Sequence, residues 1–162
     1  MTVDGPLSSQ VLNSEDIELL EKAIEQARIG WRTGGIPIGA VLAIDGDAIG
    51  AGHNQRVQKE SPILHGETDA LDNAGRLSAA QYQRATMYTT LSPCHMCTGA
   101  ILLYGIPRVV IGENRTFQGE EDLLRSHGVE VVVADSSDCI EMMETFIAAE
   151  PSLWFEDIGE ID

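Results

Sequence analysis

Residue types that bind metals or transfer protons gather in two short stretches of the sequence. LSPCHMCTGA contains Cys94 and Cys97, two of the three cysteines, and ILHGETDAL contains His65 and Glu67. Zinc prefers thiolates and imidazoles, and a site with three protein ligands keeps its fourth position for water, as catalytic zinc sites do. We therefore predict one Zn²⁺ per chain, held by His65, Cys94 and Cys97. Glu67 stays off the metal and is the predicted catalyst of proton transfer.

The order His-x-Glu followed by Pro-Cys-x-x-Cys is typical of zinc-dependent nucleobase deaminases. Here the first half is His65-Gly66-Glu67 and the second half is residues 93–97, separated by a helix and a strand of suitable length. Either half alone would be a weak signal, whereas the two together are a strong one. The pattern predicts hydrolytic deamination of an amino heterocycle.

Other uses of the cysteines remain open at this point. A Cys-x-x-Cys pair also occurs in thioredoxin-like redox proteins, although a redox pair would not need the His-x-Glu cluster. A closed structural zinc site would need a fourth ligand, for which His95 and Cys139 are available at awkward positions. Cys139 otherwise reads as an ordinary thiol. A zinc-stabilised binding module without turnover is the alternative from outside the enzymes.

Length and composition fit one domain without a membrane segment. The 162 residues, 43% of them hydrophobic, suffice for one core, and no apolar run approaches the roughly 20 residues that cross a bilayer. The first dozen residues lack the basic start and apolar core of a signal peptide, and three cysteines are too few for a disulfide framework. We expect a single domain over residues 1–162, located in the cytoplasm.

The chain is strongly acidic. Its 26 acidic and 10 basic residues give a formal net charge of −16. Such a surface repels phosphate backbones and anionic lipids, so we expect no nucleic-acid or membrane partner. Solubility, or a salt-rich cell interior, explains the charge better than a specific basic partner does. The substrate is then expected to be small and not strongly anionic.

The N-terminal part is predicted to form a helix and a hairpin. Residues 14–30 offer Ser14 as the N-cap, acids in the first turn and Gly30 near the end. The predicted apolar stripe of this helix comprises Ile17, Leu20, Ile24 and Ala27. Residues 36–52 read as two strands folded about Asp45-Gly46-Asp47, a strong hairpin signal.

The rest of the chain alternates helices and strands. We expect, in order, a helix near 62–73, a strand at 85–91, a helix near 94–104, a strand at 108–112, a helix at 119–127, a strand at 129–134 and a last helix near 136–149. Such units imply a central, partly parallel sheet covered by helices on both faces. The zinc cysteines would lie in the first turn of a helix, where the helix dipole favours thiolates.

Several longer segments carry a resemblance to a known family. They are GGIPIGAVL, GHNQR, LHGET, NAGRL, MYTTLSPCHMCTGAI, YGIPRVVIGEN and PSLWFEDIGE. In these segments the chain resembles the yeast-type cytosine deaminases of the cytidine and deoxycytidylate deaminase superfamily. The resemblance implies an α/β/α three-layer sandwich with a mixed five-stranded sheet. It also implies zinc-dependent hydrolysis of free cytosine to uracil and ammonia in pyrimidine salvage, with 5-fluorocytosine as a further substrate.

The resemblance also assigns residues to the substrate. Asn54 would read the N1 and O2 edge of the base, and the N–H of Gly66 would bond its C2 carbonyl group. The carbonyl group of Ser92 would accept from the exocyclic amine, and Asp157 would contact the polar edge of the ring. The apolar residues that match positions stacking on or capping the pyrimidine are Ile38, Phe117 and Trp154.

The C-terminal segment and the quaternary structure follow from the same resemblance. Residues 150–162 would form a lid over the active site, and the helix containing TGAILLYGI would build part of a homodimer interface. His95 stands where the resembled proteins carry an acid, and we expect it to point to solvent.

Substrates other than cytosine stay possible on these residues. They include isocytosine, 5-methylcytosine, creatinine and triazines. Guanine deaminases and tRNA adenosine deaminases share the catalytic core. The Trp-Phe-Glu-Asp tail argues against the first, and the net charge of −16 argues against the second.

Overall fold

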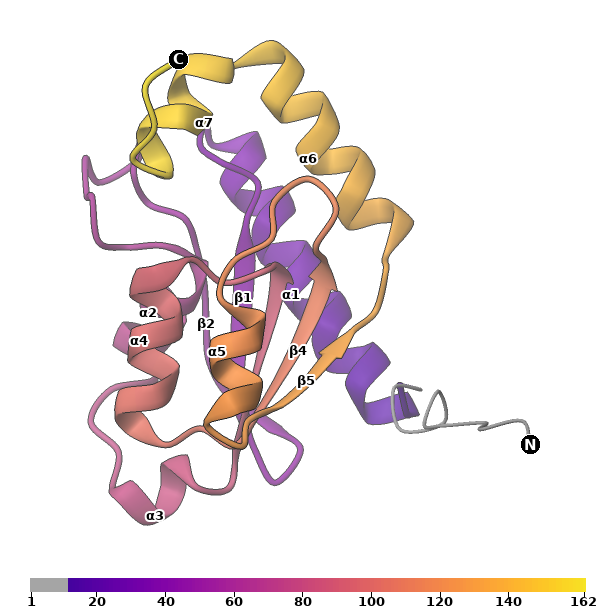
Figure 1. Cartoon of the computed structure of the whole chain (residues 1–162), viewed down its shortest axis with the longest axis vertical. Helices are drawn as coiled ribbons and strands as arrows, with labels where there is room; N and C mark the ends of the chain where they lie inside the picture. The colour runs from indigo at the N-terminus through magenta and orange to yellow at the C-terminus, as the bar shows by residue number, and fades with distance from the viewer. Residues whose placement is uncertain (1–11) are drawn as a thin grey trace.

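A mixed five-stranded sheet runs through the middle of the protein, as Figure 1 shows for the computed structural model, which describes residues 12–162. The strands are β1 (Gly39–Ile44), β2 (Asp47–His53), β3 (Ala85–Leu91), β4 (Arg108–Glu113) and β5 (Glu130–Val133), in the order β2-β1-β3-β4-β5. β1 pairs antiparallel with β2 and β3, whereas β3, β4 and β5 are parallel. The predicted mixed sheet is confirmed.

Helices cover both faces of the sheet. They are α1 (Ser14–Arg32), α2 (Gly66–Ala74), α3 (Ala79–Tyr82), α4 (His95–Tyr104), α5 (Glu121–Ser126), α6 (Ser137–Ala149) and α7 (Pro151–Asp157). α1 and α6 pack on one face, and α2, α4 and α5 pack on the other (Figure 1). The predicted three-layer α/β/α sandwich is therefore confirmed. Among the described residues, no helix combines the length and apolarity needed to span a membrane.

Alternating strand residues supply the two main cores. Leu42, Met87 and Ile111 face α2, α4 and α5, whereas the neighbouring Tyr88 and Val110 face α1 and α6. This alternation is what a sheet buried on both sides requires, because successive side chains point to opposite faces. A third cluster, near the ends of β3 and α6, contains Ile36, Ile38, Leu91, Met143, Phe146 and Trp154.

The first helix differs from its prediction at both ends. Asn13, not Ser14, is the N-cap: its side chain accepts from the N–H of Asp16, and the Asp16 carboxylate accepts from the N–H of Asn13. This reciprocal capping box satisfies two backbone donors at once. Ile17 is 52% exposed and lies outside the buried stripe, and the helix runs past Gly30 to Arg32.

The predicted hairpin is confirmed. Asp45 and Gly46 have φ values of +50° and +85° between β1 and β2. A two-residue hairpin turn whose twist matches that of the flanking strands requires a positive φ at both of its residues. Asp-Gly adopts these φ values at a low energetic cost.

Three other elements depart from expectation. α2 begins at Gly66 rather than near residue 62, because the Ser61 hydroxyl accepts from the N–H groups of Ile63 and Leu64 and holds a turn there. α6 is not the last helix, since α7 follows at once with Pro151 in its first turn, a favoured proline position. The short α3 was not predicted.

Candidate metal centre and active-site pocket

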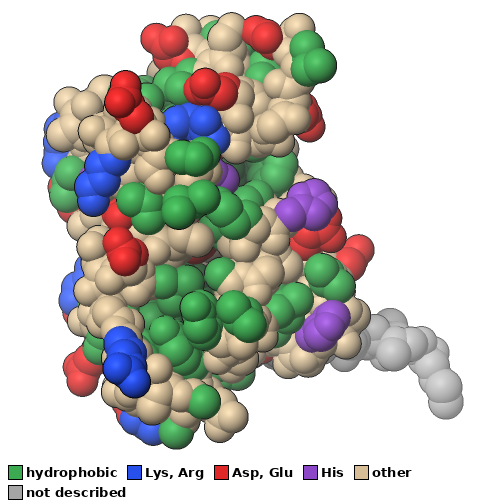
Figure 2. Space-filling view, turned by 90° about the vertical axis from the view of Figure 1, so that its left-hand side faces the viewer, with side chains coloured by type: hydrophobic (Ala, Val, Ile, Leu, Met, Phe, Trp, Pro, Cys, Tyr) green, Lys and Arg blue, Asp and Glu red, His purple; other side chains and the backbone are tan. Residues whose placement is uncertain are grey.

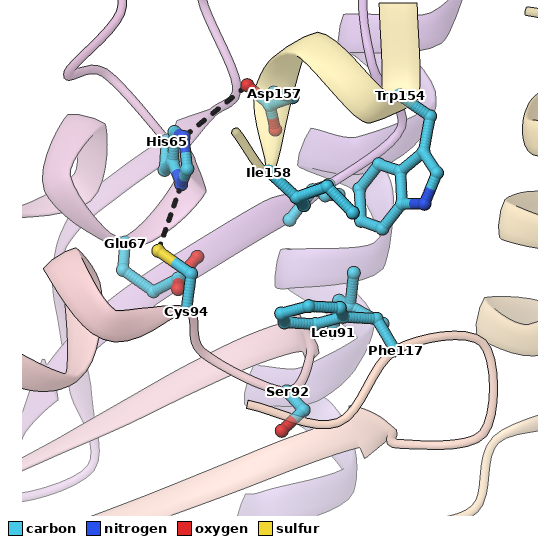
Figure 3. Close-up of a pocket in the computed structure, with 10 residues that line it drawn as sticks. His65, Glu67, Leu91, Ser92, Cys94, Phe117, Trp154, Asp157 and Ile158 are labelled. Atoms are coloured by element: carbon cyan, nitrogen blue, oxygen red, sulfur yellow. Dashed lines mark hydrogen bonds and ion pairs between the residues drawn. The ribbon is translucent and has the colours of Figure 1, made fainter. Parts of the chain in front are cut away.

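Two helix N-termini meet beside the ends of β1 and β3. His65 is the N-cap residue of α2, and Cys94 is the N-cap residue of α4, with Cys97 in the first turn of that helix. The ligand atoms of these three residues lie within 4.8 Å of one another. The Sγ atom of Cys94 lies 3.4 Å from Nδ1 of His65 (Figure 3). The structure thus brings together the three residues predicted to bind the metal.

The chemistry of this donor set suits zinc. A hydrogen bond from Cys97, together with contacts to His65, lowers the pKa of Cys94 to about 4, so its thiolate forms readily. The same bond to Cys94, with burial, raises the pKa of the Cys97 thiol, so this thiol keeps its proton until a cation replaces it. Two sulfurs and one imidazole leave one tetrahedral position for water. His65, Cys94 and Cys97 would hold the ion.

The other two candidate ligands are excluded from this cluster. The His95 side chain is 87% exposed, as expected, and its Nε2 atom lies 2.8 Å from a Glu120 carboxylate oxygen. Cys139 lies in the first turn of α6 and is packed in the core with residues such as Met142 and Tyr88. Neither belongs to the group of three ligand atoms, so the geometry supports an open catalytic site and not a closed structural one.

Glu67 lies beside these ligands and is almost completely buried. It stands in the first turn of α2, is 3% exposed and lines the pocket next to His65 and Cys94 (Figure 3). Burial raises the pKa of its carboxyl group. A buried carboxyl group with a raised pKa is suited to accept and return a proton in acid–base catalysis.

A narrow pocket opens next to the candidate metal centre. Its free space is about 20 Å³. One ordered water needs about 10–15 Å³ on a comparable scale. The residues that line the pocket are Ile38, His65, Glu67, Leu91, Ser92, Cys94, Phe117, Trp154, Asp157 and Ile158. The rings of Phe117 and Trp154 meet edge to face, 5.8 Å apart, across the pocket from the metal-binding side chains (Figure 3).

Most of the predicted site residues line this pocket. Asn54, Gly66 and Cys97 do not line the pocket, whereas the other eight do. Sequence reasoning missed Leu91 and Ile158. Each is the immediate neighbour in sequence of a predicted residue, Ser92 or Asp157, and an apolar side chain beside a polar site residue was the available signal.

Asp157 is the centre of a buried polar network. Its carboxylate accepts from Arg56 Nε at 2.7 Å and from Asn54 Nδ2 at 3.0 Å, and it lies 3.4 Å from His65 Nε2. Burial alone would raise the pKa of Asp157, but His65, Arg56 and Asn54 together hold it below its ordinary value. A carboxylate on one nitrogen of a histidine orients the ring, so Asp157 turns Nδ1 of His65 toward Cys94. Arg56 was not predicted.

Gly66 has a packing role at this position. A Cβ atom there would lie 3.2 Å from the carbonyl carbon of Gly39 and 3.3 Å from the carbonyl oxygen of Ile38. These contacts are tight, so the absent side chain lets α2 approach the start of β1. The contact of its N–H with a substrate stays a prediction.

The chain belongs to the family described as "Cytidine and deoxycytidylate deaminase zinc-binding region", because the sequence model of that family matches residues 13–113. This family is the one that the sequence motifs predicted.

Particular relatives refine the placement. Over 147 residues the chain is 54% identical to "Cytosine deaminase" from Candida albicans, covering 90% of this chain and 98% of that protein. It is 33% identical over 142 residues to "tRNA-specific adenosine deaminase" from Streptococcus pyogenes serotype M18, covering 82% of this chain and 89% of that one. Among solved structures, a Thermotoga maritima diaminohydroxyphosphoribosylaminopyrimidine deaminase/reductase superposes with a TM-score of 0.66 at 26% identity, over 84% of this chain and 42% of that one.

Proposed function

We propose that this protein deaminates free cytosine to uracil and ammonia in a zinc-dependent reaction. The observation that carries the proposal is the group His65, Cys94 and Cys97 beside the buried Glu67, at one wall of a narrow pocket whose other walls are mainly apolar and aromatic. The 54% identity to the Candida albicans cytosine deaminase supports the choice of substrate. In cells, this reaction would serve pyrimidine salvage.

Glu67 is the proposed proton carrier. When bound, zinc supplies a water molecule whose pKa is lowered to about 7. Glu67 would accept one proton from the attacking water and deliver it to N3 of the base, so that C4 becomes more electrophilic and bonds to the water oxygen. Glu67 would then accept the second proton from that oxygen and deliver it to the 4-amino group, and the C4–N bond would break to release ammonia. Water and cytosine are thereby converted to uracil and ammonia, and Glu67 returns to its starting state.

The remaining proposed contacts orient the base. Ile38, Phe117 and Trp154 pack against the ring, while the Ser92 carbonyl group accepts from the 4-amino group and the Gly66 N–H donates to the C2 carbonyl group. Asn54 and Asp157 read the N1 edge. Because their side chains bond each other at 3.0 Å in the structure, base binding would exchange part of this bond for bonds to the substrate.

The C-terminal segment 150–162 is proposed to act as a lid. α7 supplies Trp154 and Asp157 to the pocket wall, and Ile158 follows directly. A base needs more than the 20 Å³ of free space, so a wall must move, and α7 is held to the 54–56 loop mainly by polar contacts of Asp157. A ribose on N1 would collide with that contact. The pocket therefore favours a free base over a nucleoside.

An ammonia-release assay tests this function. The zinc-loaded protein should act on cytosine and 5-fluorocytosine, and much less on cytidine, guanine, isocytosine or creatinine. The Glu67→Gln variant is the matched control, since it keeps the metal ligands. Ammonia release from guanine or cytidine at rates above that from cytosine would contradict the proposal. A binding module would bind cytosine without turnover, and equally well with Glu67 or Gln.

Activity on tRNA adenosine is the second candidate, favoured by the relatives of that name. The net charge of −16 opposes it, because a phosphate backbone needs neutralising lysines and arginines. Inosine formation in an unmodified tRNA transcript would establish it.

We further propose that the protein is a cytoplasmic homodimer. A groove of about 930 Å³ between α2 and α4 is lined by apolar side chains, including Ile63, Leu103 and Tyr104 (Figure 2). Leu103 is 75% exposed, which is unusual for a leucine on an apolar face. The cytoplasm suits the three cysteines, which form no disulfide.

Light scattering tests the dimer. The protein should show twice the mass of one chain, and Leu103→Asp should convert it to a monomer. Leu123→Asp is the control, because Leu123 is also exposed but lies on α5, outside the groove. A monomeric parent protein at micromolar concentration would contradict the proposal.

A further inference from the structure

Glu121 is a buried acid that the proposed mechanism does not use. It is the first residue of α5, is 1% exposed and does not line the pocket. Its Oε2 atom accepts from the Ser92 hydroxyl at 2.6 Å, and its Oε1 atom accepts from Asn114 Nδ2 at 3.2 Å. Arg125 lies 3.6 Å away. Burying a carboxylate is costly, so an acid kept here needs these contacts for its own stability.

The hydroxyl of Ser92 both donates and accepts in this arrangement. It donates to Glu121 and accepts from the N–H of Gly119 at 2.9 Å. The side chain points away from Phe117 and Trp154 in Figure 3. The backbone N–H of Ser92 donates to the Glu113 carbonyl group at 3.0 Å. Within residues 12–162, no hydrogen bond to the carbonyl oxygen of Ser92 is formed.

The loop before α5 lies directly on the turn that follows Ser92. A Cβ atom on Gly119 would fall 1.8 Å from the carbonyl oxygen of Pro93, and the N–H of Glu120 donates to that oxygen at 3.3 Å. Only glycine allows this close approach. Two contacts therefore hold the Ser92–Pro93 turn: the Ser92 side chain bonds Glu121, and the Pro93 carbonyl group accepts from the Glu120 N–H.

We infer that Glu121 is a positioning residue that directs the carbonyl oxygen of Ser92 toward the exocyclic amine of the substrate. The inference rests on the proposed function. A hydrogen bond to a carboxylate is shorter and stronger than a neutral one, so Glu121 fixes the Ser92 side chain. With the side chain and the N–H both fixed, the carbonyl group keeps one direction. Glu121 therefore sets the preference for bases that carry an amino group.

The Glu121→Gln variant tests this role with two ligands. Ser92 and Asn114 bond two different oxygens of Glu121, and glutamine replaces one of these oxygens by an NH2 donor, so it cannot accept from both residues in place. The value of kcat/KM for cytosine should fall by about tenfold, as expected for one misdirected hydrogen bond. The inhibition constant of pyrimidin-2-one, which is cytosine without its 4-amino group, should stay within about twofold of the parent value, because the other contacts persist.

Glu113→Gln is the matched control. Glu113 is also buried and accepts from the N–H groups of Arg115 and Thr116 on the same loop, but it has no bond to the Ser92 side chain. The Glu113→Gln variant should change kcat/KM for cytosine and the inhibition constant of pyrimidin-2-one by the same factor.

Ser92→Ala keeps the carbonyl group and removes the hydroxyl, so it should also lower kcat/KM for cytosine without changing inhibition by pyrimidin-2-one. If Glu121→Gln does not fold, this variant tests the positioning role in its place. The double variant should be no worse than Ser92→Ala alone. Equal losses for both ligands, or additive losses in the double variant, would overturn the inference. A parent protein that releases no ammonia from cytosine would overturn the proposed function and this inference with it.

Discussion

Asp16 and Glu67 are both acids in the first turn of a helix, and both are buried, at opposite ends of the sheet. Asp16 meets Arg108 through two nitrogens, at 2.6 and 2.9 Å, and the Tyr88 hydroxyl at 2.8 Å. The Arg108 guanidinium holds the pKa of Asp16 below its ordinary value, despite burial. Glu67 forms no ion pair with an arginine or lysine among residues 12–162, and burial raises its pKa. Burial and helix position are shared, so the neighbouring charge is what distinguishes the structural acid Asp16 from Glu67, the proposed proton carrier.

A second pair of residues repeats the contrast. The side chains of Arg56 and Arg108 are 18% and 23% exposed, and each pairs with a buried aspartate. Neither Arg108 nor Asp16 lines the pocket beside the metal centre, whereas the partner of Arg56, Asp157, lies on the wall of that pocket and in the proposed lid. The same interaction therefore supports the fold at one end and the proposed substrate site at the other.

The largest expected effect is that of Glu67→Gln. The amide keeps the shape but cannot transfer protons, so kcat should fall by about 100- to 10,000-fold. Bound zinc and melting temperature should stay near the parent values, because the three ligands are unchanged. Steady-state kinetics and metal analysis check both statements. Asp16→Asn should lower the melting temperature and leave kcat unchanged, and a loss of activity in that variant would break the comparison.

Removing residues 150–162 comes next. The truncated protein should still fold and bind zinc, since every strand and both metal-bearing helices precede this point. Its kcat/KM for cytosine should fall by roughly 100-fold, because Trp154 and Asp157 no longer exclude water and orient the base. The melting temperature should fall as well, since Trp154 packs against Phe146 and Ile38. Parental kcat/KM would show that α7 only packs.

The two arginines give a matched test of smaller effects. Arg108→Met should destabilise the fold by about 2 kcal/mol, below the 3–5 kcal/mol of a fully buried pair, because the guanidinium is partly exposed. That corresponds to a melting temperature lower by roughly 4–8 °C, with unchanged kcat/KM. Arg56→Met should lower kcat/KM by about tenfold through a misplaced Asp157, with a smaller loss of melting temperature. Equal effects of the two variants on activity would contradict the division of roles.

Sequence reasoning located the metal centre because its residue types form a recognisable pattern, His-x-Glu followed by Pro-Cys-x-x-Cys. His65 and Cys94 are 29 residues apart, so the pattern and not their separation identified them. Arg56 and Glu121 belong to no such pattern, and their partners, Asp157 and Ser92, are 101 and 29 residues away in the sequence. A lone arginine or glutamate in a polar segment reads as a solvated charge.

Some helix boundaries also could not be predicted, even though they depend on residues close together in the sequence. α7 was not predicted because Pro151 reads as the end of a helix as easily as the beginning of one, and the seven residues of α7 are too few to show a period. Asn13 and Ser14 are both good N-cap residues. The reciprocal bond between Asn13 and Asp16 decided between them, and Asp16 also bonds Arg108, which is distant in the sequence.

The smallest expected effect concerns the pH dependence of stability. Since the pKa of Asp16 is below 3.8 in the folded protein, the unfolded chain takes up this proton first as the pH falls. The contribution of Asp16 to stability is therefore complete above that pH and is lost as the pH falls through the folded-state pKa. Asp16→Asn lacks this titration, so its melting temperature should be lower at neutral pH but should fall less than that of the parent between about pH 6 and about pH 3. Calorimetry across this range measures the difference. Parallel curves for the two proteins would mean that Arg108 does not favour the charged form of Asp16, and the contrast with Glu67 would then rest on the pocket alone.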